Sequence, residues 1–140
     1  MKSRFLIVDD DGSFCELLSL YFSAKGFEVV AARTAAEATT LLQESEFDLI
    51  ILDWYLDGAD ALDLLNLCKQ RYPAVPVIIF TGAEVEAFLK AALAGRAEAV
   101  VRKMGSLEAL SKQVCKYLQK KELVSSNHLT ATELSVKPVP

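Results

Sequence analysis

The chain has 140 residues and a mass of 15.4 kDa, which is the size of one domain. Hydrophobic residues make up 52% of it and charged residues 24%, a balance that excludes a disordered or fibrous chain and predicts a buried core. No apolar run approaches the roughly 18 residues needed to cross a bilayer, and the aspartates at positions 9–11 exclude a secretory signal peptide. We therefore expect a cytoplasmic protein with no membrane contact.

The charge of the chain is unevenly distributed. The net charge is −4 and the isoelectric point about 5.0, which argues against nucleic acid as a direct partner because binding that polyanion needs a basic face. Residues 1–63 carry 13 acidic and 4 basic side chains, whereas residues 64–140 carry 6 acidic and 11 basic ones. The acidic first half is therefore where we look for cation ligands.

Cysteine usage favours free thiols. The three cysteines, Cys15, Cys68 and Cys115, are odd in number and widely spaced, and each lies on an apolar helical stripe. We expect all three to be buried, reduced side chains in a reducing compartment, with no disulfide and no zinc site.

The first half of the chain repeats a strand followed by a helix. Residues 5–8 form a continuous apolar run closed by aspartates, as a strand buried on both faces would before a turn. A helical apolar stripe follows, with Gly26 as a left-handed C-cap. Residues 27–32 predict a second strand, and Thr34 with Glu37 form a capping box for a second helix. The stripe residues are Phe14, Leu17, Leu18, Tyr21 and Phe22 in the first helix and Ala38, Leu41 and Leu42 in the second.

The second half continues this alternation. Strands are expected at residues 49–52, 77–80 and 99–101, with helices beginning near Ala61, covering residues 84–94 and following a cap at Ser106. Five strands and five helices at about 25 residues per unit build a parallel sheet covered on both faces, because such crossovers are right-handed. The predicted fold is α/β, a doubly wound five-stranded parallel sheet flanked by five helices. We assign residues 1–121 to this domain and residues 122–140, where the composition changes, to a C-terminal tail or linker.

Polar side chains follow the predicted strands at their carboxyl ends. They are Asp9 and Asp10, Asp53, Thr81 and Lys103. In an open parallel sheet the binding site lies outside this edge. Three close carboxylates repel one another unless a cation lies among them, and hard oxygen ligands suit Mg²⁺. A carboxylate here could attack a phosphate ester, with the metal and an ammonium group neutralising the developing charge.

Helix capping offers a simpler interpretation of the aspartates. Aspartate favours turns and caps helices, which accounts for any one of these positions, and Asp11 in particular is better placed to cap the first helix than to face the cluster. Capping explains less well why Lys103 ends one strand and Thr81 another. We therefore favour a functional site for the set as a whole, and we expect the neighbouring Trp54 to pack near the site without contacting a ligand.

Four motifs at these spacings resemble the receiver domain of two-component response regulators: IVDDD, LIILD, IIFTG and VVRK. The resemblance covers residues 4–121 and agrees with a flavodoxin-like fold. It implies that Asp53 is the phosphoacceptor and that a histidine kinase or a phosphotransfer protein phosphorylates it. It also implies that Mg²⁺ is bound by Asp9, Asp10, Asp53 and the backbone carbonyl of Tyr55, that Thr81 hydrogen-bonds the phosphoryl group and that Lys103 pairs with it.

The chain departs from this family's usual pattern at four positions. After the acceptor, Asp57 stands in place of a proline and Ala61 in place of a glycine, so a differently shaped loop is expected. Met104 replaces the proline that commonly follows the lysine. Val100 replaces the aromatic residue that usually changes position on phosphorylation. The conformational change is therefore expected to occur without an aromatic side chain at this position.

The resemblance implies a switch without catalytic activity beyond its own phosphorylation and dephosphorylation. Phosphorylation would alter the face formed by residues 84–94, 99–101 and the last helix, which would bind a downstream protein or pair two copies of the chain. One alternative is a pseudo-receiver that binds partners constitutively, usually marked by loss of an acid or the lysine, and none is lost here. A second is a magnesium-dependent aspartyl phosphatase, which needs a second acid where Tyr55 stands.

Overall fold

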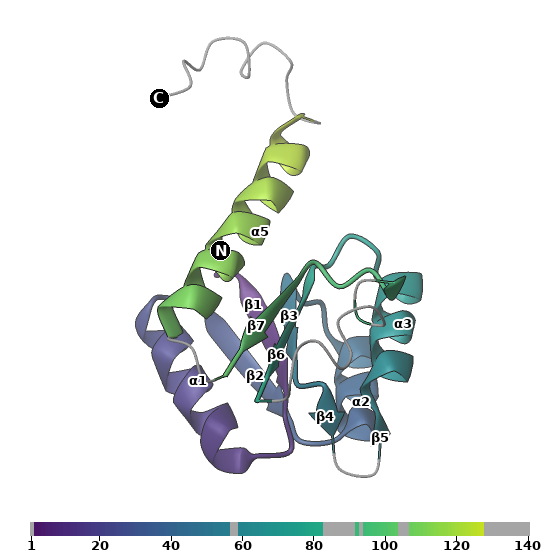
Figure 1. The fold of residues 1–140 in the computed structure, drawn as a ribbon. Coiled ribbons are helices and arrows are strands. Elements are labelled where there is room, and N and C mark those ends of the chain that lie inside the picture. The colour runs from purple at the N-terminus through teal and green to yellow at the C-terminus, as the bar shows by residue number, and fades with distance from the viewer. Residues whose placement is uncertain (1, 57–58, 83–91, 93, 104–106, 128–140) are drawn as a thin grey trace.

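A five-stranded parallel sheet forms the centre of the molecule in the computed structural model, which describes residues 2–56, 59–82, 92, 94–103 and 107–127 (Figure 1). The strand order is β2-β1-β3-β6-β7 and every neighbouring pair is parallel. The strands are β1 (Arg4–Val8), β2 (Glu28–Ala32), β3 (Leu49–Leu52), β6 (Val77–Thr81) and β7 (Ala99–Arg102). The chain adds β2 on one side of β1 and the later strands on the other, which confirms the predicted doubly wound sheet.

Helices cover both faces of the sheet (Figure 1). α1 (Gly12–Ala24) and α5 (Leu107–Asn127) pack on one face, and α2 (Ala35–Glu44) and α3 (Ala61–Arg71) on the other. Successive strand residues point to opposite faces, so Phe5 and Ile7 join the core under α1 and α5 while Leu6 and Val8 join the core under α2 and α3. Burial on both faces is the reason that the strands are continuous apolar runs.

Three of the predicted helix caps are present in the part of the chain that the structure describes. The Asp11 carboxylate accepts hydrogen bonds from the backbone N–H groups of Ser13 and Phe14 at the start of α1. The Thr34 hydroxyl accepts one from the N–H of Glu37 at the start of α2, 3.0 Å away. Gly26 has φ +94° just past the end of α1, a conformation that a residue with a Cβ adopts only with strain. The helix boundaries therefore follow from local chemistry.

Two features of the structure were not expected from the sequence. A short antiparallel hairpin of β4 (Tyr55–Leu56) and β5 (Ala59–Asp60) follows β3, where a loop was expected. α5 runs to Asn127 and so includes residues 122–127 of the segment assigned to a C-terminal tail or linker. No glycine or proline interrupts residues 119–127, so nothing in the local sequence forces the helix to end earlier. The expected helix at 84–94, apart from residues 92 and 94, and the expected cap at Ser106 lie outside the described residues.

Two side chains are less buried than predicted. Leu17 was placed on the apolar stripe of α1, but it is 46% exposed, because the buried face of that helix is centred on Cys15, Leu18 and Phe22. Cys115 is exposed, whereas Cys15 and Cys68 are buried free thiols as expected. Helical periodicity identifies the apolar side of a helix but does not show where the contact with the sheet ends.

A buried ion pair joins α3 to the amino ends of β6 and β7. Lys69, only 4% exposed, donates hydrogen bonds from Nζ to both carboxylate oxygens of Glu98 and to the Val75 carbonyl. Glu98 Oε1 also accepts a bond from the backbone N–H of Val77, and the Tyr117 hydroxyl of α5 donates to the Glu98 carbonyl at 2.7 Å. This network fixes the edge of the sheet opposite to the predicted site. None of the described helices has the length and apolarity that a membrane span requires.

Candidate functional site

Three carboxylates meet at the carboxyl edge of the sheet. Asp9 and Asp10 follow β1 and Asp53 follows β3, and because Val8 pairs with Leu52 in register, the residues after them are neighbours. One carboxylate oxygen from each lies within 4.8 Å of the other two. Asp9 and Asp53 are 2% and 7% exposed, and Asp10 is half-buried. The structure thus brings together the three acids that the sequence suggested as metal ligands.

Lys103 reaches this cluster from the end of β7. Its ammonium donates a hydrogen bond to Asp9 Oδ2 at 2.5 Å and another to Asp53 Oδ2 at 3.3 Å. Its backbone N–H donates to the carbonyl of Thr81, the buried last residue of β6. Four of the five strands therefore deliver a polar group to one edge, as the sequence predicts.

The charged groups of the cluster shift the pKa values of their neighbours. Burial raises the pKa of the Asp9 carboxyl above its usual value, and the charge of Asp53 adds to this effect, although the hydrogen bond from Lys103 opposes it. Burial alone would lower the pKa of Lys103, but the hydrogen bond to Asp9 and the charges of both acids raise it above the usual value. Among the contacts described for this cluster, the Lys103 ammonium reaches two of the three carboxylates. This donor set, made of hard oxygen atoms, fits a divalent cation such as Mg²⁺.

Backbone hydrogen bonds hold the acids in place. Asp9 Oδ1 accepts a bond from the N–H of Asp11 at 2.9 Å, and Asp53 Oδ1 accepts one from the N–H of Tyr55 at 3.3 Å. The N–H of Asp53 donates to the Val8 carbonyl, which extends the pairing of β3 with β1. The carboxylates are therefore oriented by the two turns that follow their strands.

Two residues contact the cluster although the sequence did not predict that they would. The Arg33 guanidinium donates from Nη2 to the Asp10 carbonyl at 3.0 Å, and a Cβ added to Gly12 would lie 3.1 Å from its Cζ. Nothing in the sequence connects Arg33 with a loop 23 positions earlier. Phe14 was interpreted only as a core residue of α1, but its ring lies beside the Lys103 ammonium, with 4.3 Å between Nζ and the ring centroid.

The two residues after Asp53 differ in burial. Trp54 is half-buried and packs against the core on the α2 and α3 face, which agrees with its interpretation as a packing residue. Tyr55 lies in β4 and is 57% exposed. A bulky side chain therefore stands in solvent two positions after the central aspartate.

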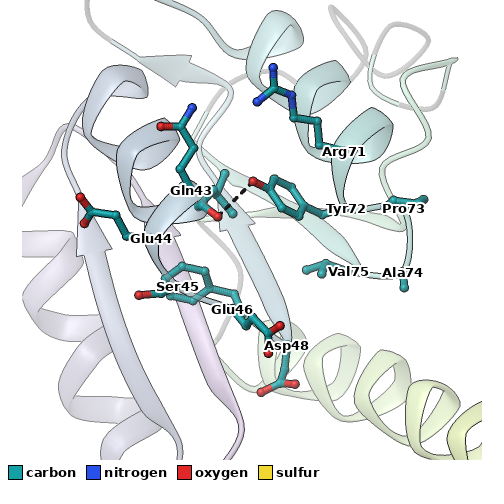
Figure 2. Close-up of a pocket in the computed structure, with 12 residues that line it drawn as sticks. Gln43, Glu44, Ser45, Glu46, Asp48, Arg71, Tyr72, Pro73, Ala74 and Val75 are labelled. Atoms are coloured by element: carbon teal, nitrogen blue, oxygen red, sulfur yellow. Dashed lines mark hydrogen bonds between the residues drawn. The ribbon is translucent and has the colours of Figure 1, made fainter.

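A separate hollow of about 610 Å³ lies away from the acidic cluster (Figure 2). It is lined by the segment from the end of α2 to the start of β3 and by the segment after α3. In Figure 2 the Tyr72 side chain points towards α2, where its hydroxyl donates to the Leu42 carbonyl at 3.0 Å. This hollow belongs to the amino edge of the sheet and shares no residue with the carboxylate site.

Comparisons with known proteins agree with the fold and the motifs. A family model described as the response regulator receiver domain matches residues 5–115. The response regulator protein FleR of Pseudomonas aeruginosa is 34% identical over 103 residues, which are 73% of this chain and 22% of that protein. The transcriptional regulatory protein GlrR of Escherichia coli is 35% identical over 79 residues, which are 56% of this chain and 18% of that protein. The chain thus spans about a fifth of the length of these relatives.

Solved structures resemble the chain over most of its length. A CheY-like response regulator receiver domain protein from Methanospirillum hungatei has a TM-score of 0.83 at 25% identity, covering 87% of this chain and 98% of that one. The response regulator protein TrrA from Thermotoga maritima, solved in complex with Mg(2+)-BeF, has a TM-score of 0.75 at 26% identity, covering 84% and 99%. With the family model matching residues 5–115, these findings show that the chain belongs to the response regulator receiver domain family.

Proposed function

We propose that the chain is a phosphoacceptor switch in which Asp53 receives a phosphoryl group from a histidine kinase or a phosphotransfer protein. The observation that carries this proposal is the cluster itself: an aspartate at the end of β3, two further carboxylates within 4.8 Å, and a lysine ammonium in contact with it. An Asp53 oxygen would attack phosphorus, the P–N bond of the donor phosphohistidine would break, and its electron pair would leave with the imidazole.

The surrounding residues have distinct roles in this proposal. Asp9, Asp10, Asp53 and the Tyr55 carbonyl would hold Mg²⁺, which when bound neutralises phosphoryl oxygens and the carboxylates around them. Lys103 would exchange its bond to Asp53 for a phosphoryl oxygen, and Thr81 would donate its hydroxyl to another. The related Thermotoga maritima protein was solved in complex with Mg(2+)-BeF, which supports the proposal that a protein of this fold binds Mg²⁺.

Phosphorylation is tested by mass spectrometry after incubation with acetyl phosphate and Mg²⁺. We expect one added phosphoryl group in the parent chain and none in Asp53→Ala or without the metal. A parent chain that gains no mass would overturn the proposal in favour of a constitutive interaction module. Sustained release of inorganic phosphate from many equivalents of donor ester would instead indicate a phosphatase.

Metal binding is tested separately through the fluorescence of Trp54, the chain's single tryptophan, next to the proposed acceptor. Titration with Mg²⁺ is expected to change its emission in the parent chain, and Asp10→Ala is expected to shift the curve to higher concentrations. Asp11→Asn is the matched control, because Asp11 caps α1 and asparagine caps equally well. An unchanged curve in Asp10→Ala would contradict the metal assignment.

The downstream partner is proposed to bind the face formed by residues 84–94, β7 and α5. Residues 84–91 and 93 of this face lie outside the described part of the chain. On α5, the exposed Lys112 and Lys116 suit an acidic partner surface and a salt-sensitive association rate, and two copies could also pair through this face. Val100 has no ring to move when Thr81 moves, so other parts of the face would carry the signal.

Hydrogen exchange with and without beryllofluoride, a stand-in for the phosphoryl group, is expected to show altered protection in residues 84–121. If protection changes only in the loops around Asp53 and Thr81, the chain accepts phosphoryl groups without relaying a signal through this face. It would then serve as a phosphate sink or transfer intermediate.

A further inference from the structure

The Lys103 ammonium is bordered by an aromatic ring as well as by carboxylates. Its Nζ lies 4.3 Å from the centroid of the Phe14 ring, in addition to its contacts with Asp9 and Asp53. The lysine side chain is only 15% exposed. A cation over an aromatic face is attracted by the negative face of the ring, and more strongly where little water competes. The ring therefore restricts where the ammonium can go.

Phe14 is itself held on two sides. Its backbone N–H donates to the Asp11 carboxylate in the N-terminal cap of α1, which fixes the position of its Cα. Its ring centroid lies 5.5 Å from that of Phe80, at an interplanar angle of 56°. Phe80 is 1% exposed and precedes Thr81 in β6. The ring is thus partly buried against the core and is not an exposed side chain that happens to lie near the lysine.

We propose that Phe14 is a positioning residue for Lys103, a role that rests on the proposed function of Asp53. The ammonium is closer to Asp9 than to Asp53, at 2.5 Å against 3.3 Å, and the lysine stem has four flexible carbons. The attraction of the ring for the ammonium restricts the positions that the ammonium takes up beside Asp9 and Asp53. Lys103 is then oriented for an arriving phosphoryl group before that group binds, which lowers the cost of ordering it during transfer.

The test replaces Phe14 alone with mono-, di- and trifluorinated phenylalanine, which progressively weakens the negative ring face with little change in volume. The rate constant for phosphorylation by acetyl phosphate is expected to fall in steps, by about three- to tenfold over the series. The thermal midpoint is expected to fall by no more than about 3 °C, which corresponds to the loss of this single contact. Phe27, which stacks on Phe5 at 4.5 Å within the same core, is the matched control position and is expected to give a flat series.

A second readout needs neither metal nor phosphodonor. In EDTA, the effects of Phe14→Leu and Lys103→Met on the unfolding equilibrium constant are expected to be non-additive by about two- to fivefold, since each removes one half of the same contact. A flat fluorine series together with additive effects in EDTA would overturn the role of Phe14 while leaving phosphorylation of Asp53 intact. A parent chain that is not phosphorylated at all would instead refute the proposed function, and with it this role.

Discussion

Removing the negative charge of Asp10 is expected to stabilise the metal-free protein. Two unit charges 4.8 Å apart repel by about 3.5 kcal/mol at an effective dielectric constant of about 20. Asp10 faces the charges of Asp9 and Asp53, which the Lys103 ammonium contacts, while the Arg33 guanidinium donates to the Asp10 carbonyl. Because Asp10 is half-buried, water and salt screen the remaining repulsion, and Asp10→Asn should raise the free energy of unfolding by about 1 kcal/mol.

Thermal unfolding in EDTA measures this effect directly. A gain of about 1 kcal/mol corresponds to a rise in Tm of about 3 °C for a domain of this size. Asp11→Asn removes the same charge one position away and keeps the cap of α1, so it should leave Tm unchanged or lower it slightly. Asp10→Asn is thus expected to raise Tm, whereas Asp11→Asn is expected to leave Tm unchanged or to lower it slightly.

Addition of Mg²⁺ should reverse the order of stability. A ligand at about 100 times its Kd stabilises the native state by about 2.7 kcal/mol, a gain that Asp10→Asn should largely lose because one ligand is missing. The parent chain should therefore melt above the Asp10→Asn variant in saturating Mg²⁺ and below it in EDTA. If Asp10→Asn lowers Tm in EDTA as well, the repulsion inferred among the three carboxylates is not present and the reasoning fails.

Three further outcomes test other parts of the structure. Tyr55→Ala should speed the first-order decay of the phosphorylated protein several-fold, because the bulky side chain at this position obstructs in-line attack by water; equal decay rates would refute this screening. Burial raises the pKa of the Cys68 thiol from its ordinary value of 9.0 to about 11. The unfolded chain therefore loses this proton at a lower pH than the folded chain does, so the stability that the buried neutral thiol contributes is complete below pH 9.0 and is lost as the pH rises to about 11. Urea unfolding should show a decline of about 2–3 kcal/mol over that range that Cys68→Val removes, and an alkylating reagent at pH 8 should label only Cys115 in the native chain. Lys69→Met should cost about 2–3 kcal/mol in the same assay, since it leaves the partly buried Glu98 without its cation, and a loss below about 0.5 kcal/mol would show that the pair contributes little.

Local sequence determined most of the secondary structure. Apolar runs such as residues 49–52 can be buried on both faces only as central strands, and the capping of α1 by Asp11 and of α2 by Thr34 needs no tertiary contact. The set of acids at the carboxyl edge could also be predicted, because a parallel sheet brings the ends of its strands together whatever the other side chains are.

Other features depend on contacts between distant residues. Periodicity alone placed Leu17 in the core and left Phe14 as one core residue among several, since a helix shows its apolar side but not its neighbours. The exposure of Cys115 was misjudged for the same reason. The β4–β5 hairpin depends on pairing between two-residue segments, which is too short a pattern to recognise in sequence.

The order of the amino acids specifies which residue types follow the strands, and therefore the chemistry available at the edge of the sheet. How those groups are paired depends on the packing of distant elements. Three of these contacts join residues that are far apart in the sequence. Lys103 contacts Asp9 at 2.5 Å across 94 positions, and the Phe14 ring lies beside the same ammonium across 89 positions. The hydrogen bond from Arg33 to the Asp10 carbonyl spans 23 positions. Such contacts depend on the packing of α1 against β6 and β7 and on the placement of β2 beside β1, which no local pattern encodes.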